Sequence, residues 1–294
     1  VDFDGASGEC VALIGPNGAG KSTCFACLAG QQQPDQGRVF WQGRDVTDRS
    51  PAARQALGMA RTFQVAQTFE ALTVVQNIQL VRARQRLSWW DRLAGREHEV
   101  ALRALAQVGL TGLADAVVAD LPYGAKKRLE LAMALAGLPE HPAPGESLLL
   151  LDEPAAGLAP AERADMMALV RQVAASGVTV LYTEHNMDAV FGVADRVLVL
   201  MQGHLVADGT PEAVACNPQV RERYLGQDFE WTPSPATPPP SLRLARNAQG
   251  DRAILAVVGL NAWWDHAQVL FDVNLEVGEG ELVVLQGLNL SLIH

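Results

Sequence analysis

The chain has 294 residues, enough for one large domain, or for one domain and part of another. Its hydrophobic fraction of 49% and charged fraction of 19% are ordinary for a globular protein. Apolar runs stay far below the roughly 20 residues of a membrane-spanning helix, so neither a secretion leader nor a membrane anchor is expected. The formal net charge of −10 argues against nucleic acid as the main partner, because phosphate backbones are bound by basic surfaces.

From residue 1 to about residue 226, short apolar runs alternate with amphipathic stretches. This alternation is typical of an α/β domain with a mostly parallel sheet. Each apolar run is nearly continuous, as expected for strands that are covered on both faces. The predicted strands are Cys10–Ile14, Ser147–Leu151, Val178–Thr183 and Arg196–Met201.

Between about residues 69 and 139 the strand signals vanish and helical spacing dominates. Glu97–Val108 and Gly124–Ala136 are the clearest predicted helices of this stretch. We interpret it as a helical subdomain that is inserted into the α/β core.

Residues 227–250 include TPSPATPPPS, and consecutive prolines predict an extended linker. Residues 251–294 resume strand-like alternation. Within them, VLFDVNLEVGEGELVVLQG is similar to VDFDGASGECVALIG at the start of the chain, which indicates an internal repeat. We therefore expect 1–226 to be one domain and 251–294 to be the truncated start of a second domain of the same kind.

A phosphate-binding loop is predicted directly after the first strand. It matches G-x-x-x-x-G-K-[ST] at Gly15, Pro16, Asn17, Gly18, Ala19, Gly20, Lys21, Ser22 and Thr23. Glycines let successive backbone N–H groups point at phosphate oxygens, and the following helix adds its positive end. Lys21 is expected to reach the β- and γ-phosphates, and Ser22 to supply a hydroxyl ligand to Mg²⁺.

An acidic pair ends the apolar run LLLLDE. A strand that ends in Asp152 places a carboxylate at the C-terminal edge of the sheet, beside the phosphates. Asp152 is therefore the candidate for the Mg²⁺ shell. Glu153, one residue further on, is the candidate to orient and deprotonate an attacking water molecule.

Further motifs lie between and after the phosphate loop and the acidic pair, and their order is typical of one family. RTFQ ends at Gln64, LPYGAKKRLE covers residues 121–130, AAGLAP covers residues 155–160, and TEHNM contains His185. With this order the chain resembles the ATP-binding cassette (ABC) ATPases. The resemblance implies a P-loop NTPase cassette, an α/β fold with a mostly parallel sheet and an inserted helical subdomain.

The resemblance also implies roles for the matching residues. Lys21, Glu153 and His185 are expected to be catalytic, as phosphate clamp, general base and γ-phosphate switch. ATP is expected to contact the phosphate loop, Gln64 and Gly124. The implied Mg²⁺ ligands are Ser22, Gln64 and Asp152.

The family's signature helix implies a head-to-tail pair of cassettes that sandwiches ATP. The N-terminus of this helix near Gly124 offers N–H groups and partial positive charge to the γ-phosphate. The usual L-S-G-G-Q is written LPYGA here, with Pro122 in place of a serine and Ala125 in place of a glutamine. This departure puts in question whether the site is fully active when paired.

Within the family, GMARTFQ, DEPAAGL and EHNMDAVFGVADRVLVLMQGHLVADGTP resemble the ATPases of branched-chain amino acid importers. The resemblance implies that ATP hydrolysis powers import of such solutes or of related amides. It implies transmembrane permease subunits, a second ABC subunit or domain and, indirectly, an external solute-binding protein as partners, and no nucleic acid. The implied location is peripheral, at the cytoplasmic face of the plasma (inner) membrane.

Family members carry a strand and an adenine-stacking aromatic residue upstream of the phosphate loop. Only 14 residues precede Gly15, so we expect the first cassette to lack that strand and to bind nucleotide weakly. In the second copy, Trp264 lies at the position of that aromatic residue; a buried core tryptophan is the alternative. No lysine follows Gly287, so a second triphosphate site is not expected, and we interpret the chain as a fragment of two fused cassettes.

Two other functions remain open at this stage. One is a soluble ABC-type ATP switch that acts on the ribosome or on nucleic acid, against which the acidic net charge and the Pro-rich linker argue. The other is a non-catalytic regulatory cassette. The replacement of the signature serine by Pro122 favours it, and the presence of the candidate base Glu153 argues against it.

Overall fold

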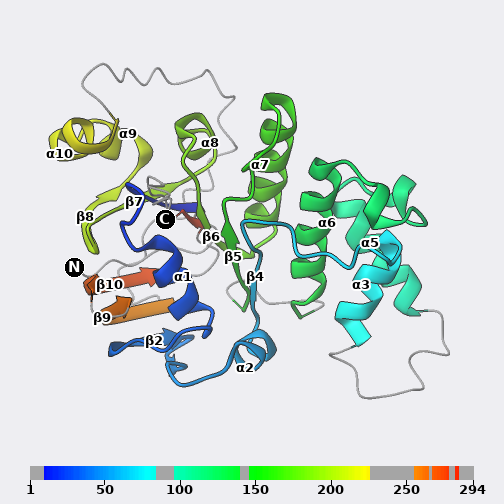
Figure 1. Ribbon diagram of the computed structural model, residues 1–294, viewed down its shortest axis with the longest axis horizontal. Helices are drawn as coiled ribbons and strands as arrows, with labels where there is room; N and C mark the ends of the chain where they lie inside the picture. Colours follow the sequence, from blue (N-terminus) through cyan, green and yellow to red (C-terminus); the bar gives the residue numbers. More distant parts are fainter. Residues whose placement is uncertain are drawn as a thin grey trace.

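A computed structural model describes residues 10–83, 96–139, 146–225, 255–264, 267–277 and 282–284. A mostly parallel sheet lies at its centre (Figure 1), with helices packed against it. Its strands run in the order β4 (Met59–Arg61), β5 (Leu148–Asp152), β6 (Thr179–Thr183), β1 (Cys10–Ile14), β11 (Leu282–Val284), β7 (Arg196–Met201) and β8 (His204–Gly209). Only β8 pairs in antiparallel fashion, with β7.

Both faces of this sheet are buried at β1, β4, β5, β6 and β7, because alternate residues of these strands enter different core clusters. In β1, Cys10, Ala12 and Ile14 join one cluster, whereas Val11 and Leu13 join the other. The alternation follows from the two-residue period of a strand. It explains why the strands appear in the sequence as continuous apolar runs rather than alternating ones.

Two segments of the chain share one register in the centre of the sheet. Cys10 of β1 and Leu282 of β11 both lie opposite Val180, and Val11 and Val283 both lie opposite Arg196. These pairs are the ones that the internal repeat aligns, since Cys10 and Leu282 each follow a Gly-Glu dipeptide. The second cassette remains a prediction.

A second, antiparallel sheet joins the two ends of the described chain. Its order is β10 (Ala267–Val277), β9 (Leu255–Trp264), β2 (Gln36–Trp41) and β3 (Arg44–Asp45). β9 and β10 form a hairpin, and β9 lies along β2 with Val257 opposite Val39. Val257 and Val273 belong to the core cluster that also contains Phe25, so the hairpin is part of the packed lobe around the first phosphate loop.

The helices are α1 (Lys21–Leu28), α2 (Pro51–Ala56), α3 (Val74–Ala83), α5 (Arg96–Gln107), α6 (Tyr123–Ala136), α7 (Pro160–Ala175), α8 (Met187–Phe191), α9 (Pro211–Ala215) and α10 (Pro218–Val220). Two 3₁₀ turns lie at Thr111–Leu113 and Val118–Asp120, and a π turn at Arg221–Leu225. Figure 1 shows α3, α5 and α6 together on the right, beside the sheet. This is the helical subdomain that the sequence predicts.

The predicted elements agree closely with the observed ones. β1 and β7 have the predicted bounds, whereas β5 and β6 each begin one residue later than predicted. The helices predicted at 97–108 and 124–136 are α5 and α6, each beginning one residue earlier. The predicted linker, 227–250, lies outside the described residues. Within the described part of the chain, no helix is both long and apolar enough to cross a membrane.

Candidate nucleotide-binding site

The predicted phosphate loop lies between β1 and α1. Gly18 and Gly20 have φ of 74° and 99°, a left-handed conformation that side chains other than glycine rarely adopt. Gly20 is the N-cap of α1, which has no side-chain cap and no acidic residue in its first turn. The first amide groups of a helix have no intrahelical acceptor, so this end of α1 suits the oxygens of a phosphate group.

Lys21 is held inside the loop and is only 8% exposed. Its Nζ donates to the carbonyl oxygens of Gly15 and Pro16, at 3.5 and 3.4 Å. Burial lowers the pKa of Lys21 to about 8, and the nearby charges of Glu153 and Asp152 oppose that shift. A phosphate group would favour the charged ammonium in the same way as these carboxylates, because opposite charges stabilise each other.

Asp152 ends β5 at the C-terminal edge of the sheet, as the sequence predicts. One of its carboxylate oxygens accepts from the Thr183 hydroxyl at 2.9 Å, and the other lies 3.0 Å from Nη2 of Arg61. The Ser22 side chain, one of the other predicted Mg²⁺ ligands, is exposed. A carboxylate, a hydroxyl and the amide oxygen of Gln64 are hard oxygen donors of the kind Mg²⁺ takes, so the donor set fits.

Glu153 is the centre of a small group of polar side chains. Its Oε2 accepts from Nε2 of Gln64 at 2.9 Å and lies 3.7 Å from Nδ1 of His185. Its backbone N–H donates to the carbonyl oxygen and the hydroxyl of Thr183. Glu153 also has a φ of 47°, a conformation that costs a non-glycine residue of order 1 kcal/mol and often occurs at functional sites.

The electrostatics of this group favour an ionised Glu153. Its pKa lies below the usual range for a glutamate, chiefly because of the contact with His185. The same contact raises the pKa of His185. Glu184, almost fully buried, accepts from the backbone N–H of Ala155, and its pKa is raised by desolvation. The two neighbouring glutamates are thus shifted in opposite directions.

Gly124 lies at the beginning of α6, in the helical subdomain. Pro122 is the N-cap of this helix, which has no side-chain cap and no acidic residue in its first turn. A Cβ at Gly124 would lie 2.6 Å from a carboxylate oxygen of Glu162, and one at Gly157 would lie 3.1 Å from the Tyr123 ring. Gly124 thus packs against the start of α7 rather than completing the group around Glu153.

Of the predicted site residues, Lys21, Asp152, Glu153, Gln64 and His185 therefore come together. The side chain of Trp264 lies outside the described part of the structure. Sequence reasoning missed Arg61, Thr183, Lys127 and Glu130, all of which contact site residues or the segment that carries Gln64. Lys127 and Glu130 lie in a helix that also carries Lys126 and Arg128, so their charges alone do not distinguish them in the sequence.

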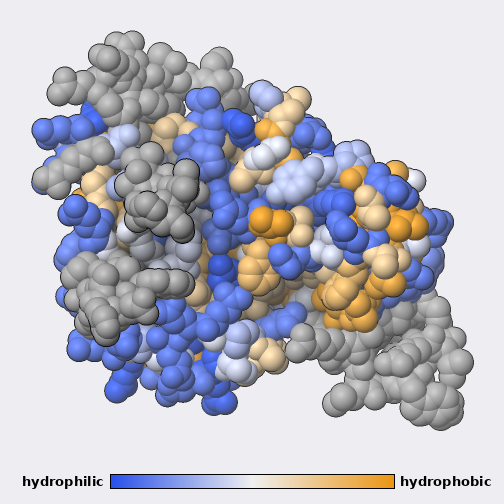
Figure 2. Space-filling model, in the orientation of Figure 1, coloured by the Kyte–Doolittle hydropathy of each residue, from blue (hydrophilic) through white to orange (hydrophobic). Residues whose placement is uncertain are grey.

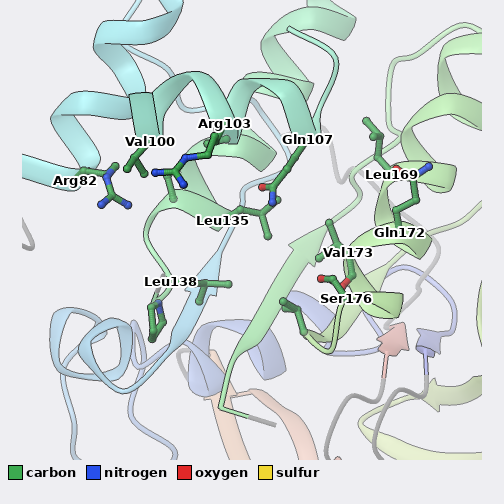
Figure 3. Close-up of a pocket in the computed structure, with 14 residues that line it drawn as sticks. Arg82, Val100, Arg103, Gln107, Leu135, Leu138, Leu169, Gln172, Val173 and Ser176 are labelled. Atoms are coloured by element: carbon green, nitrogen blue, oxygen red, sulfur yellow. The ribbon is translucent and has the colours of Figure 1, made fainter. Parts of the chain in front are cut away.

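A cavity of about 630 Å³ lies away from this group. Figure 3 shows Val100, Arg103 and Gln107 on one side of it, and Gln172 and Val173 of α7, with Ser176 just after that helix, on the other. It is a cleft between the helical subdomain and α7, and none of its lining residues is a predicted site residue.

Comparison with known proteins identifies the family of the chain. The family model "ABC transporter" matches residues 1–156, and the model "Branched-chain amino acid ATP-binding cassette transporter" matches residues 204–230. The chain is 36% identical over 230 residues to the high-affinity branched-chain amino acid transport ATP-binding protein BraF of Pseudomonas aeruginosa, covering 74% of this chain and 88% of BraF.

Two other relatives extend the comparison. The lipopolysaccharide export system ATP-binding protein LptB of Acidithiobacillus ferridurans is 34% identical over 230 residues, covering 78% of this chain and 90% of LptB. The crystal structure of the ADP conformation of MJ1267, an ATP-binding cassette of an ABC transporter, matches with a TM-score of 0.65 and 30% identity. That match covers 75% of this chain and 89% of MJ1267. The chain belongs to the ATP-binding cassette ATPases of ABC transporters.

Proposed function

We propose that this chain binds ATP with Mg²⁺ and hydrolyses it to power a membrane importer of branched-chain amino acids or related amides. The hydrolytic part of the proposal rests on the Glu153 carboxylate. Its Oε2 lies 2.9 Å from Nε2 of Gln64 and 3.7 Å from Nδ1 of His185, and its pKa is lowered. An ionised carboxylate in a fixed orientation is suited to accept a proton from water.

Each neighbouring residue has a role in this proposal. The phosphate loop and Lys21 bind the triphosphate, and Ser22, Asp152 and Gln64 would hold Mg²⁺, which neutralises phosphate charge. Glu153 orients the attacking water molecule and takes its proton. His185 stabilises the Glu153 carboxylate and lies at the end of β6, where it would face the γ-phosphate.

A second cassette is proposed as a partner because Gly124 lies apart from the group around Glu153. In a head-to-tail pair, the uncapped beginning of α6 would face the triphosphate of the other cassette. Pro122 is at the N-cap, where the lack of an N–H does not interrupt the helix, so backbone donors of α6 remain available.

Permease subunits are the other proposed partners. Figure 2 shows apolar side chains gathered over the helical subdomain, while most of the rest of that face is hydrophilic. Phe63, Val65 and Phe69, on either side of Gln64, are 36%, 65% and 50% exposed. Exposed apolar groups of this size favour a protein contact. A membrane subunit at this surface would place the chain at the cytoplasmic face of the membrane, with an external binding protein acting through it.

The solute class rests on the model match at residues 204–230 and on the likeness to BraF. The likeness to LptB shows that the cassette by itself does not specify the solute. The ribosomal or nucleic-acid switch and the regulatory cassette have no comparable support.

ATPase assays of the chain and of Glu153→Gln test the hydrolytic proposal. We expect turnover to fall at least about 100-fold in the variant, while ATP binding persists and ATP stabilises a dimer. Glu212→Gln, at an exposed position of α9, is the matched control and should keep wild-type turnover. Equal turnover in Glu153→Gln and the wild type would rule out Glu153 as the base.

A further inference from the structure

Two buried charged residues of α6, Lys127 and Glu130, hold the backbone around Gln64. Their side chains are 2% and 6% exposed, and Nζ of Lys127 lies 3.8 Å from Oε2 of Glu130. Lys127 Nζ donates to the carbonyl oxygens of Phe63 and Gln64, at 3.1 and 2.6 Å. Glu130 Oε1 accepts from the N–H groups of Phe63 and Gln67, at 2.9 and 3.2 Å.

Burial of this pair is unfavourable for both charges. Desolvation lowers the pKa of Lys127 and raises that of Glu130, so the folded protein disfavours both ionised forms. Buried ion pairs often contribute less to stability than apolar residues of similar size. The four backbone groups that they satisfy, however, belong to a segment without regular secondary structure, where no helix or sheet supplies partners. The pair therefore specifies the position of this segment.

The segment joins the signature helix to the catalytic carboxylate. Lys127 follows Gly124 by three residues, so it lies about one helical turn along α6 from the end proposed to meet a triphosphate. Gln64, whose carbonyl oxygen accepts from Lys127, donates through its side chain to Glu153. Gln64 thus connects α6 to Glu153 by two hydrogen bonds.

We propose that Lys127 and Glu130 are positioning residues that couple the beginning of α6 to the contact between Gln64 and Glu153. An anion that engages α6, such as the triphosphate held by a second cassette, would thereby set the orientation of Gln64 in the site of this chain. The inference rests on the proposed function for its ligand. The hydrogen bonds by which Lys127 and Glu130 hold residues 63–67, called the clamp below, can be tested without measuring turnover.

Amide hydrogen exchange of the full chain tests the clamp directly. In Lys127→Gln we expect the N–H groups of Phe63 and Gln67 to exchange about tenfold faster or more, although their acceptor is Glu130. The amides of Leu129 and Leu131, inside α6, should keep their wild-type rates. Unchanged exchange at Phe63 and Gln67 would overturn the proposal. Glu130→Leu, which removes their acceptor, shows the exchange rates of a released segment.

Steady-state kinetics test the coupling. We expect Lys127→Gln to lower kcat about tenfold with KM for ATP within about twofold of the wild type, and Lys127→Arg to restore most of kcat. Because Lys127 acts through Gln64, the double variant Gln64→Ala/Lys127→Gln should be no slower than Gln64→Ala alone. Effects that multiply in the double variant would refute coupling through Gln64.

Lys126→Gln is the matched control. Lys126 lies on the same helix and pairs with Glu70 at 2.8 Å, away from Gln64. Lys126→Gln should leave kcat and the exchange of the Phe63 amide unchanged. If its effect were as large as that of Lys127→Gln, the effects of both variants would be due to a general weakening of α6. Absence of turnover in the wild type would count against the proposed function. The amide exchange rates alone would then show whether Lys127 and Glu130 hold the segment around Gln64.

Discussion

The guanidinium of Arg61 lies 3.0 Å from the carboxylate of Asp152, the residue proposed to hold Mg²⁺. The rings of Phe25 and Phe63 flank Arg61, with centroids 5.7 and 5.2 Å from its Cζ. Arg61 therefore has little freedom to move away when a divalent cation approaches. A fixed positive charge at this distance opposes a second cation at the same carboxylate.

Replacement of Arg61 should therefore strengthen the response to Mg²⁺. In Arg61→Gln we expect half-maximal ATPase activity at a Mg²⁺ concentration about three- to tenfold lower than in the wild type. A Mg²⁺ titration at constant ATP measures this shift. Arg128→Gln is the control, because Arg128 pairs with the exposed Asp165 at 3.3 Å. A higher Mg²⁺ requirement in Arg61→Gln would mean that Arg61 orients Asp152 rather than competing with the cation.

The contact between His185 and Glu153 should make stability depend on pH. Because the pKa of His185 is raised, its contribution is complete below about pH 6.5 and is lost as the pH rises through the folded pKa. Because the pKa of Glu153 is lowered, its contribution is present above about pH 4.5 and is lost as the pH falls through the folded pKa. The pair stabilises the fold between these limits.

Urea unfolding of the wild type and of His185→Gln measures this contribution. We expect the wild type to be more stable at about pH 5.5, and the difference to shrink towards zero at about pH 8.5. A difference of equal size at both pH values would exclude the ion pair as its cause.

Arg54 should be among the most important residues for the stability of the part of the core that packs around α1. It is 1% exposed and donates to the carbonyl oxygens of Cys27 and Leu28, at the C-terminal end of α1, both at 2.6 Å. It also donates to those of Arg49 and Thr47. Arg54→Met would remove these four hydrogen bonds, two of them to buried carbonyl oxygens, and we expect a loss of about 3–5 kcal/mol in the free energy of unfolding. Chemical denaturation measures it, and Arg49→Met, at an exposed position, should change it by less than about 0.5 kcal/mol.

The junction between β2 and the C-terminal hairpin can be tested with two glycines of similar conformation. Gly37 and Gly43 have φ of 93° and 71°. A Cβ at Gly37 would lie 2.4 Å from the carbonyl group of Gly259, whereas one at Gly43 would have no neighbour within 4 Å. Both alanine variants carry backbone strain, but only Gly37→Ala also separates β2 from β9.

We expect Gly43→Ala to cost of order 1 kcal/mol and Gly37→Ala clearly more, because the clash adds to the strain. Gly37→Ala should also release the hairpin from β2, so limited proteolysis of β9 and β10 should become faster. Equal stability of the two variants would mean that β9 does not pack against β2 in solution.

Much of the fold and of the site could be predicted because the relevant signals are local. The phosphate loop needs a strand, a glycine-rich turn and a helix in succession, and these lie within residues 10–28. Asp152 and Glu153 follow their strand directly, and β1 and β7 have the predicted bounds. The observed bounds of β5 differ by one residue from the predicted ones. The observed bounds depend on which backbone groups pair with a neighbouring strand, and the sequence does not specify this.

Arg61, Lys127 and Glu130 could not be assigned in the same way. Arg61 lies 91 positions from Asp152, and Lys127 lies 63 positions from Gln64. The sequence around each of these residues is that of an ordinary strand end or helix. Their importance arises from burial beside a particular partner, and burial depends on how the helical subdomain packs against the core.

By itself, the sequence determined the family, the phosphate loop, the acidic pair and the order of the main elements, since short motifs and apolar periodicity encode local geometry. Only the tertiary structure showed that a hairpin at residues 255–277 completes the sheet of β2, and that α6 grips the backbone of Gln64. The reason is that these contacts join segments far apart in the chain, whose buried polar groups need partners, and no local pattern specifies which segments meet.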